Sequence, residues 1–507
     1  MKKQVKGIIG LSAVLVLLGG GFAALKLTDP DKDKPSESSE VADPNAPKGA
    51  DIIIVTDDKT EGELGVVKNA VIKNETDELK VKMLTAATDE ASAVYTLEGY
   101  EDINLNTDTI GTLINNGNGL HSTSLVEEHC TNFEKFGLDK PRVTVEYNYE
   151  SGGYAKFYVG NDAPSNTGAY VYAEGSDTVY TASFSALANF KNKMVDFIDK
   201  TMLKEPDDPS AYPKIEKFTI ERDDLEKPII LEYDKTTEEK YSGGSSSTHI
   251  MTSPTDCHLS GDKASEVLNK MYGLYAKDIY SVHCKESDIA GAGLKEPFCR
   301  VEMDCEGTEN DRTLLLSEVF TDENDAKCCY AMFENGNMIY IISEENAIWL
   351  KTEPISLISK MMVNSYVWNI SGFTFDLPDG TSEKFEIKLK GGKKQEDAQT
   401  EDYEVKRNGA DFDPERYRQL YAFIISGNLE EFAFEVPVPD SKPMMSLSYT
   451  DSYTKKTTKY DYYEDSVMRS LIVVDGESKF YCSKSFVNTL IDNVKRLETG
   501  EDYVKTW

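Results

Sequence analysis

Short alternating runs of hydrophobic and polar residues recur three times along this chain. Residues 170–180, 329–340 and 470–481 each place a β-prone run, a turn with glycine and a second β-prone run. Asn-Gly and Asp-Gly pairs suit such turns because both residues tolerate positive φ. A serine follows each hairpin, ahead of an apolar-periodic run: Ser183, Ser343 and Ser483. The pattern predicts a hairpin followed by a serine-capped helix in each copy.

The recurring hairpins belong to longer repeats. The stretch 136–202 has a second copy at 293–361 and a third from Lys442 to the C-terminus. Each copy is preceded by a shorter front hairpin and a helical run, and the front hairpins fall at 67–84, 215–233 and 370–389. Repeats of this length indicate a chain built from tandem copies of one structural unit. The order of hairpin, helix, longer antiparallel strands and helix predicts an α+β fold with helices on one face of each sheet.

The predicted architecture is therefore an N-terminal transmembrane helix followed by three tandem related antiparallel α+β units. The units are expected at residues 51–206, 213–363 and 366–507. A length of 507 residues fits this number at ~150 residues a domain. Two Gly-, Ser- or Lys-rich inserts, 241–255 and 390–400, predict flexible surface loops.

The N-terminal region predicts a membrane anchor. Residues 1–6 carry Lys2, Lys3 and Lys6 and form the expected cytoplasmic tail, and residues 7–27 form the expected transmembrane helix. Residues 28–50 are rich in Pro, Ser and charge and predict a disordered linker. The alternative is a cleaved signal peptide, but the apolar run continues past the small-residue site near Phe22. The expected location is the cell membrane, single-pass, with the C-terminal region extracellular.

The composition limits the classes of partner that the chain is expected to bind. The chain has 55 Lys and Arg against 89 Asp and Glu, a formal charge of -34. Such a surface repels nucleic acid, so no nucleic-acid partner is expected. Solubility explains the charge more simply than an acidic docking surface does. Six of the eight cysteines fall between positions 257 and 329, without a CxxC spacing. We expect Cys299 and Cys305 on one face of one strand, too far apart to bridge each other.

The sequence contains no recognised catalytic motif: P-loop, GxSxG and HExxH patterns are all missing. Three histidines stand beside cysteines, in the pairs His129-Cys130, Cys257-His258 and His283-Cys284. Such residues suit zinc, but neighbours on a strand face opposite ways, so packing is the favoured interpretation. We therefore assign no catalytic, cofactor-binding or metal-binding residue and expect a protein that is not an enzyme.

Two further groups of side chains leave alternatives open. Acid pairs such as Asp102 with Asp108, or Glu127 with Glu128, suggest a hydrolase only if a pocket perturbs them. Seven strand tyrosines suggest a glycan-stacking surface, although cross-strand packing also explains them: Tyr147, Tyr149, Tyr154, Tyr158, Tyr170, Tyr172 and Tyr180. A cell-wall glycan-binding protein is thus the alternative function.

The stretch Phe136-Gly137-Leu138-Asp139-Lys140-Pro141, together with Gly160 and the 170–180 hairpin, resembles the domain of unknown function 4340 family. The motif becomes Gly-Leu-Lys-Glu-Pro at 293–297 and Lys-Pro at 442–443. The resemblance implies a bacterial membrane-anchored protein associated with ABC-type or gliding-motility-like transporters. It implies an extracytoplasmic, non-enzymatic accessory that binds transporter membrane components or an exported substrate, with the lipid bilayer contacted through the N-terminal helix.

Overall fold

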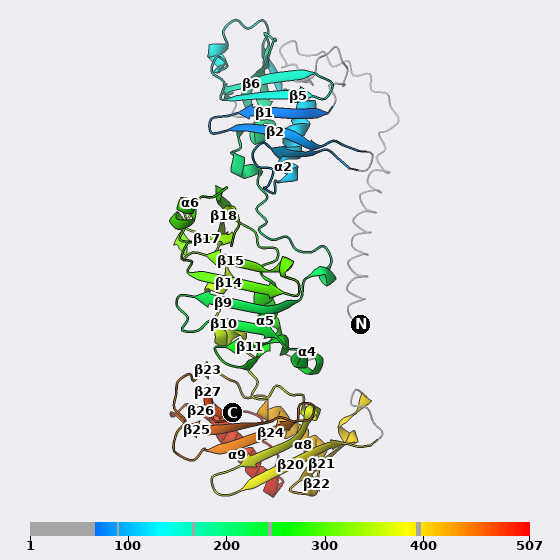
Figure 1. Ribbon diagram of the computed structural model, residues 1–507, viewed down its shortest axis with the longest axis vertical. Coiled ribbons are helices and arrows are strands. Elements are labelled where there is room, and N and C mark those ends of the chain that lie inside the picture. The colour runs from blue at the N-terminus through cyan, green and yellow to red at the C-terminus, as the bar shows by residue number, and fades with distance from the viewer. Residues whose placement is uncertain (1–65, 89–90, 165–167, 242–245, 392–396) are drawn as a thin grey trace, which may run out of the picture. The chain divides into compact units, whose positions relative to one another are not determined.

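The computed structural model describes residues 66–88, 91–164, 168–241, 246–391 and 397–507. The described chain is α+β and rich in strands, with three antiparallel sheets and few helices (Figure 1). The predicted tail, anchor and linker at 1–6, 7–27 and 28–50 lie outside the described residues. Among the described residues, no helix has the length and apolar character needed to cross a membrane.

The strands group into one sheet per predicted unit. The first sheet contains β1 (Val67–Lys73), β2 (Glu78–Thr85), β3 (Val94–Leu97), β4 (Ser124–Glu127), β5 (Val143–Tyr149), β6 (Tyr154–Asp162), β7 (Gly168–Ala173) and β8 (Val179–Ser183). The second contains β9 (Ile215–Arg222), β10 (Ile229–Tyr233), β11 (Ser246–Ser253), β12 (Cys257–Ser260), β13 (Asp278–Val282), β14 (Cys299–Cys305), β15 (Arg312–Leu316), β16 (Phe320–Thr321), β17 (Lys327–Phe333) and β18 (Met338–Ser343). The third contains β19 (Ile370–Asp376), β20 (Ser382–Leu389), β21 (Tyr403–Arg407), β22 (Ala410–Phe412), β23 (Glu431–Phe432), β24 (Met445–Asp451), β25 (Thr457–Glu464), β26 (Arg469–Val474) and β27 (Glu477–Ser483).

The three sheets share one strand order. In the third sheet the order is β22-β21-β20-β19-β24-β25-β26-β27-β23. The second sheet has the same order, β12-β11-β10-β9-β14-β15-β17-β18-β13, and β16 pairs with β17 beside it. The first sheet has the order β3-β2-β1-β5-β6-β7-β8-β4, with one front strand fewer. In every sheet the front hairpin pairs through its first strand with the longer meander. This common order supports the predicted tandem repeat.

The helices are short and pack mainly against the sheets. They are α2 (Thr107–Asn115), α3 (Phe184–Leu187), α4 (Lys235–Tyr241), α5 (Gly261–Asn269), α6 (Glu286–Gly291), α7 (Pro354–Leu357), α8 (Pro414–Ile424) and α9 (Lys484–Thr499). Asp413 caps α8 by accepting the Glu415 N–H, and Pro414 occupies the first turn. Helix α9 buries Phe486, Val487, Leu490 and Val494 among its inward residues, which places it in the core of the third sheet.

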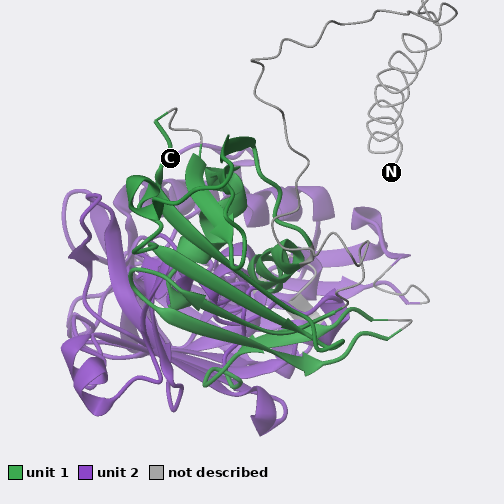
Figure 2. Ribbon diagram, turned by 90° about the horizontal axis from the view of Figure 1, so that it is seen from above, with its two compact units in different colours: residues 1–102, 107–194 green, residues 103–106, 195–507 purple. Residues whose placement is uncertain are grey.

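Tertiary contacts divide the chain into two compact units. Unit 1 comprises residues 1–102 and 107–194, and unit 2 comprises 103–106 and 195–507 (Figure 2). Unit 1 holds the first sheet, and unit 2 holds the second and third sheets around one hydrophobic core. Each predicted range, 51–206, 213–363 and 366–507, contains one sheet; their boundaries remain predictions.

The repeat motif covers one face of the meander in the first two sheets. In unit 1, Phe136 and Leu138 are buried against Val179, with Tyr170 and Tyr172 at the edge of the cluster. Gly137 has φ +69°, which ends the preceding turn and returns the chain across β6. A Cβ on Gly160 would lie 2.3 Å from the Phe136 carbonyl oxygen, so glycine permits this close approach. Leu294 occupies a comparable buried cluster in unit 2.

Two local predictions were wrong. The insert 241–255 was expected to be a loop, but residues 246–253 form β11, which pairs with both β10 and β12. The β-prone His-Ile-Met-Thr sequence within it fits a central strand, and this tertiary pairing overrides the Gly-Ser composition. Ser343 caps no helix, because a turn follows it and only the single 3₁₀ turn Ile348–Leu350 forms.

Other local predictions hold. Ser183 accepts the Ala186 N–H and caps α3. Ser483 stands at the N-cap of α9, although its hydroxyl makes no capping bond. Cys299 and Cys305 lie at the two ends of β14 and are both buried on one face, as expected. All eight cysteines are free thiols.

A matched pair of glycine substitutions tests the packing of the motif in unit 1. Gly160→Ala places a methyl group against the Phe136 carbonyl and should destabilise unit 1 by about 1–3 kcal/mol. Gly111→Ala lies in α2 with open space around the new methyl group and should stabilise the unit by roughly 0.5–1 kcal/mol. Urea-dependent proteolysis of unit 1 peptides, read by mass spectrometry, measures both changes. Equal effects of the two substitutions would refute the proposed close approach.

Buried His249 gives unit 2 a pH-dependent stability. Its Nε2 donates to the Ile215 carbonyl at 2.9 Å, and its Nδ1 lies 3.0 Å from the Thr248 hydroxyl, which fits a neutral ring. Burial lowers the pKa of the His249 imidazole, against the raising effect of the bond to Ile215. The neutral form is therefore favoured in the folded state. Its stabilisation is present above the unfolded pKa of about 6.5 and is lost as the pH falls through the folded value.

We expect the urea midpoint of unit 2 to fall between pH 7 and pH 5.5, and to fall less in His249→Gln than in the wild type. The three tryptophans all belong to unit 2, so their fluorescence reports its unfolding. His283→Asn is the matched control because His283 is exposed in the same unit and asparagine tolerates its positive φ. A slope in His249→Gln as steep as the wild-type slope would contradict the assignment.

Candidate functional site: a cleft within unit 2

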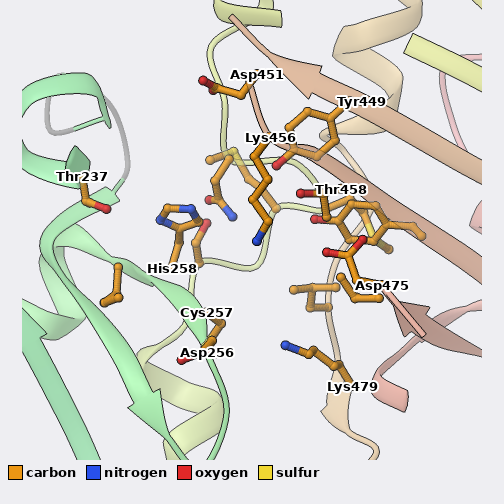
Figure 3. Close-up of a pocket in the computed structure, with 18 of the residues that line it drawn as sticks. Thr237, Asp256, Cys257, His258, Tyr449, Asp451, Lys456, Thr458, Asp475 and Lys479 are labelled. Atoms are coloured by element: carbon orange, nitrogen blue, oxygen red, sulfur yellow. The ribbon is translucent and has the colours of Figure 1, made fainter. Parts of the chain in front are cut away.

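A cleft of about 380 Å³ opens between the second and third sheets, inside unit 2. One wall comes from β12 and the start of α4, and the other from β24, β25 and β27 with their turns (Figure 3). This volume lies at the small end of the ~300–1,000 Å³ range of small-molecule sites. The cleft is therefore sized for a small ligand or a short segment of a larger one.

The segment 358–361 fixes the two walls against each other. On one side Ile358 bridges to Leu259, and the Ser359 N–H donates to the His258 carbonyl at 2.8 Å. On the other side Met361 bridges to Asn428, and the Leu429 N–H donates to the Lys360 carbonyl at 2.9 Å. One extended stretch thus bonds to both sheets. We call residues 358–361 the connector.

The wall from the second sheet carries Cys257 and His258. Burial raises the pKa of the Cys257 thiol to about 12, although the charge of Lys479 from the opposite wall opposes this effect. Burial also lowers the pKa of the His258 imidazole, while the nearby carboxylates Asp234 and Asp451 raise it. At neutral pH the thiol is protonated and the ring is neutral. This pair is not an activated nucleophile and base.

The wall from the third sheet carries two lysines. Lys456 ends the turn between β24 and β25, and its side chain reaches down into the cleft (Figure 3). Lys479 lies on β27 at a bulge: Ile472 pairs with Phe480, and Val473 pairs with Ser478, which leaves Lys479 as the extra residue. Bulges re-aim side chains, and here the lysine points into the cleft.

Three aspartates that line the cleft accept hydrogen bonds from backbone N–H groups of its walls. Asp451 accepts the N–H groups of Tyr453 and Thr454 at 2.9 and 2.8 Å. Asp475 accepts the Lys459 N–H at 2.8 Å, and Asp234 accepts the Thr237 N–H at 2.6 Å. Their carboxylates therefore hold the walls in shape. A fourth, Asp256, is exposed at the edge of β12.

The other two His-Cys pairs are structural features of the repeat. His129 and His283 follow β4 and β13 and have positive φ values of 54° and 50°. The next residues, Cys130 and Cys284, join the clusters under the repeat motif, and their N–H groups donate to Asp177 and Asn337 in the hairpin turns. Across the described residues, no group of three or more His, Cys, Asp or Glu side chains is arranged to hold a metal ion.

The acid pairs singled out in the sequence are not drawn together into a pocket. Asp102 and Asp108 are both exposed, and Glu127 forms an ion pair with Lys135 at 2.9 Å. The lysine holds the pKa of that carboxyl below its usual range, which is the opposite of a poised general acid.

The seven tyrosines mostly pack within unit 1. Tyr147 and Tyr149 are buried, and Tyr158 stacks on Tyr172 with ring centroids 4.8 Å apart. Tyr170 packs against Phe136 at 4.8 Å. Only Tyr154 is exposed, at 46%. Cross-strand packing accounts for most of these rings.

The cleft itself was not predicted, because its residues come from separate copies of the repeat. Two sequence signals were present. The residue four positions before the serine that ends each hairpin is Val179 in the first copy, Ile339 in the second and Lys479 in the third. Val179 and Ile339 are buried and apolar, so the lysine at this position of the third copy indicates that the position does not serve core packing there. The run Thr454-Lys455-Lys456 is also basic within an acidic chain.

Comparison with known proteins places part of the chain in a family. No curated protein and no solved structure matches it. The family model described as Domain of unknown function (DUF4340) matches residues 96–297, which span most of the first repeat and the front of the second. The resemblance seen in the Gly137-Leu138 motif is thereby confirmed over residues 96–297, which match the DUF4340 family model.

Proposed function

We propose that this protein is a non-enzymatic binding protein of the cell surface, an extracytoplasmic accessory of an ABC-type export system. The observation that carries the binding role is the cleft of unit 2, whose walls come from two repeats and are fixed by the connector. Its mixed polar and apolar lining and its size suit recognition of a ligand. The link to export rests on the family resemblance.

The chemistry of the cleft favours binding over catalysis. Cys257 carries a thiol whose pKa is raised to about 12, so it is not a ready nucleophile near neutral pH. Three of the aspartates accept backbone N–H groups of the cleft walls: Asp451 and Asp234 from residues two or three positions further on, and Asp475 from Lys459 on β25. Tandem related units also suit a scaffold that holds partners.

A tyrosine-rich glycan-binding surface has less support. The rings proposed for stacking on sugars stack mainly on one another, as Tyr158 does on Tyr172. Tyr154 alone, of the seven, offers an exposed ring at 46%. Sugar-stacking sites need an accessible aromatic face.

Co-purification from the native host tests the accessory role. The full chain with a C-terminal tag is extracted from membranes in a non-ionic detergent and captured, and its partners are quantified by mass spectrometry. We expect an ABC-type permease or ATPase subunit to be enriched about tenfold or more over the control, which corresponds to a difference in binding free energy of roughly 1.4 kcal/mol. The control is an unrelated, tagged single-pass membrane protein at the same abundance. Enrichment of no transporter subunit would overturn the proposal.

A further inference from the structure

The cleft holds two lysines that form no ion pair with any acidic residue in the described part of the chain. Among the described residues, no carboxylate lies within ion-pair distance of Lys456 or Lys479. Their neighbours are engaged: Lys459 pairs with Asp461 at 2.9 Å, and Lys455 donates to the Ser452 carbonyl. The side chains of Lys456 and Lys479 instead face the same cleft (Figure 3). They point to an anion as the missing partner.

The bulge in β27 belongs to the third copy alone among the equivalent hairpins. The register of β26 and β27 shifts at Val473, whereas the β7–β8 and β17–β18 pairings run without a shift. The bulge adds Lys479 where the other copies have buried Val179 and Ile339. Bulges are enriched beside binding sites, where they turn one side chain toward a ligand. The third copy has therefore changed a packing position into a charged one that faces the cleft.

A polar acceptor also borders the cleft without a partner. The Oδ1 atom of Asn364, just after the connector, is buried and has no hydrogen-bond partner among the described residues. A buried acceptor left unpaired costs about 1–3 kcal/mol, so a donor from a ligand would relieve it. A hydroxyl group is such a donor. The hydroxyl of Thr458 lies on the wall between the two lysines (Figure 3) and adds a further hydrogen-bonding group.

We propose that the cleft binds a small hydroxylated anion, such as a sugar acid or a sugar phosphate. Lys456 and Lys479 hold its carboxylate or phosphate group, and Asn364 accepts a hydrogen bond from one of its hydroxyls. The volume of about 380 Å³ limits the bound part to a small molecule or the end of a chain. This assignment rests on the binding role proposed above and names the class of its ligand. It does not depend on the link to a transporter.

Titration calorimetry on the full chain in a non-ionic detergent tests the assignment. The probes are glucuronate, glucose 6-phosphate, neutral glucose and inorganic phosphate. We expect at least one of the two sugar anions to bind more tightly than both glucose and inorganic phosphate, with an affinity that falls as salt is added. Tighter binding of glucuronate indicates a carboxylate ligand, and tighter binding of glucose 6-phosphate indicates a phosphate ligand.

The variants identify the groups that bind. Lys456→Gln and Lys479→Gln should each weaken the sugar anion by roughly tenfold or more, because each removes a charge-assisted hydrogen bond. Lys455→Gln is the matched control: it removes the same charge from the same turn, but its ammonium group bonds to the Ser452 carbonyl. It should change the affinity less than about twofold. Unchanged thermal unfolding of each variant shows that the fold is kept.

Three results would overturn the assignment. They are binding of neither sugar anion, equal binding of glucose, and equal losses in Lys455→Gln and the cleft variants. Inorganic phosphate bound as tightly as glucose 6-phosphate would overturn the hydroxyl contact at Asn364. A failure here concerns the purified protein alone, so it is distinct from a failure to co-purify a transporter.

Discussion

The constraint on which the account depends is the pairing of the connector with both sheets of unit 2. On one side the Ser359 N–H donates to the His258 carbonyl, and on the other side the Lys360 carbonyl accepts from the Leu429 N–H. Backbone bonds of this kind are satisfied only if both neighbours stay in place. The cleft therefore has walls of fixed separation rather than two sheets joined by a loose linker. A binding site assembled from two repeats requires that rigidity.

The same pairing recurs one repeat earlier within unit 2. Ile198 bridges to Leu105 and Thr201 bridges to Tyr275, as Ile358 and Met361 bridge in the later copy. The repeat thus supplies a common frame, in which strand order, motif packing and connector are shared. Under the proposed binding role, differences between copies mark the residues that contact the ligand. Lys479 at the β27 bulge is one such difference, since its counterparts Val179 and Ile339 are buried.

The sequence predicts the structure correctly where the determining interactions are local. The hairpin at Asp475-Gly476 has two consecutive positive φ values, 51° and 94°, as its turn chemistry predicts. Pro414 and Asp413 start a helix for equally local reasons. The prediction of a loop at 241–255 was wrong because β11 pairs with strands on both sides. This pairing, and not the local composition, decides the structure there. The candidate site lay beyond prediction because Lys456, Lys479 and His258 meet only through tertiary packing. The predicted anchor at 7–27 lies outside the described residues.

Hydrogen–deuterium exchange of the native full chain tests the central claim most directly. If the connector is bonded to both sheets, the amides of Ser359 and Leu429 exchange as slowly as those of β24 and β25. The exposed turn at residues 440–442 serves as the fast reference within the same unit. Exchange of Ser359 and Leu429 at the rate of that turn would contradict the account, because the walls of the cleft would then not be held together.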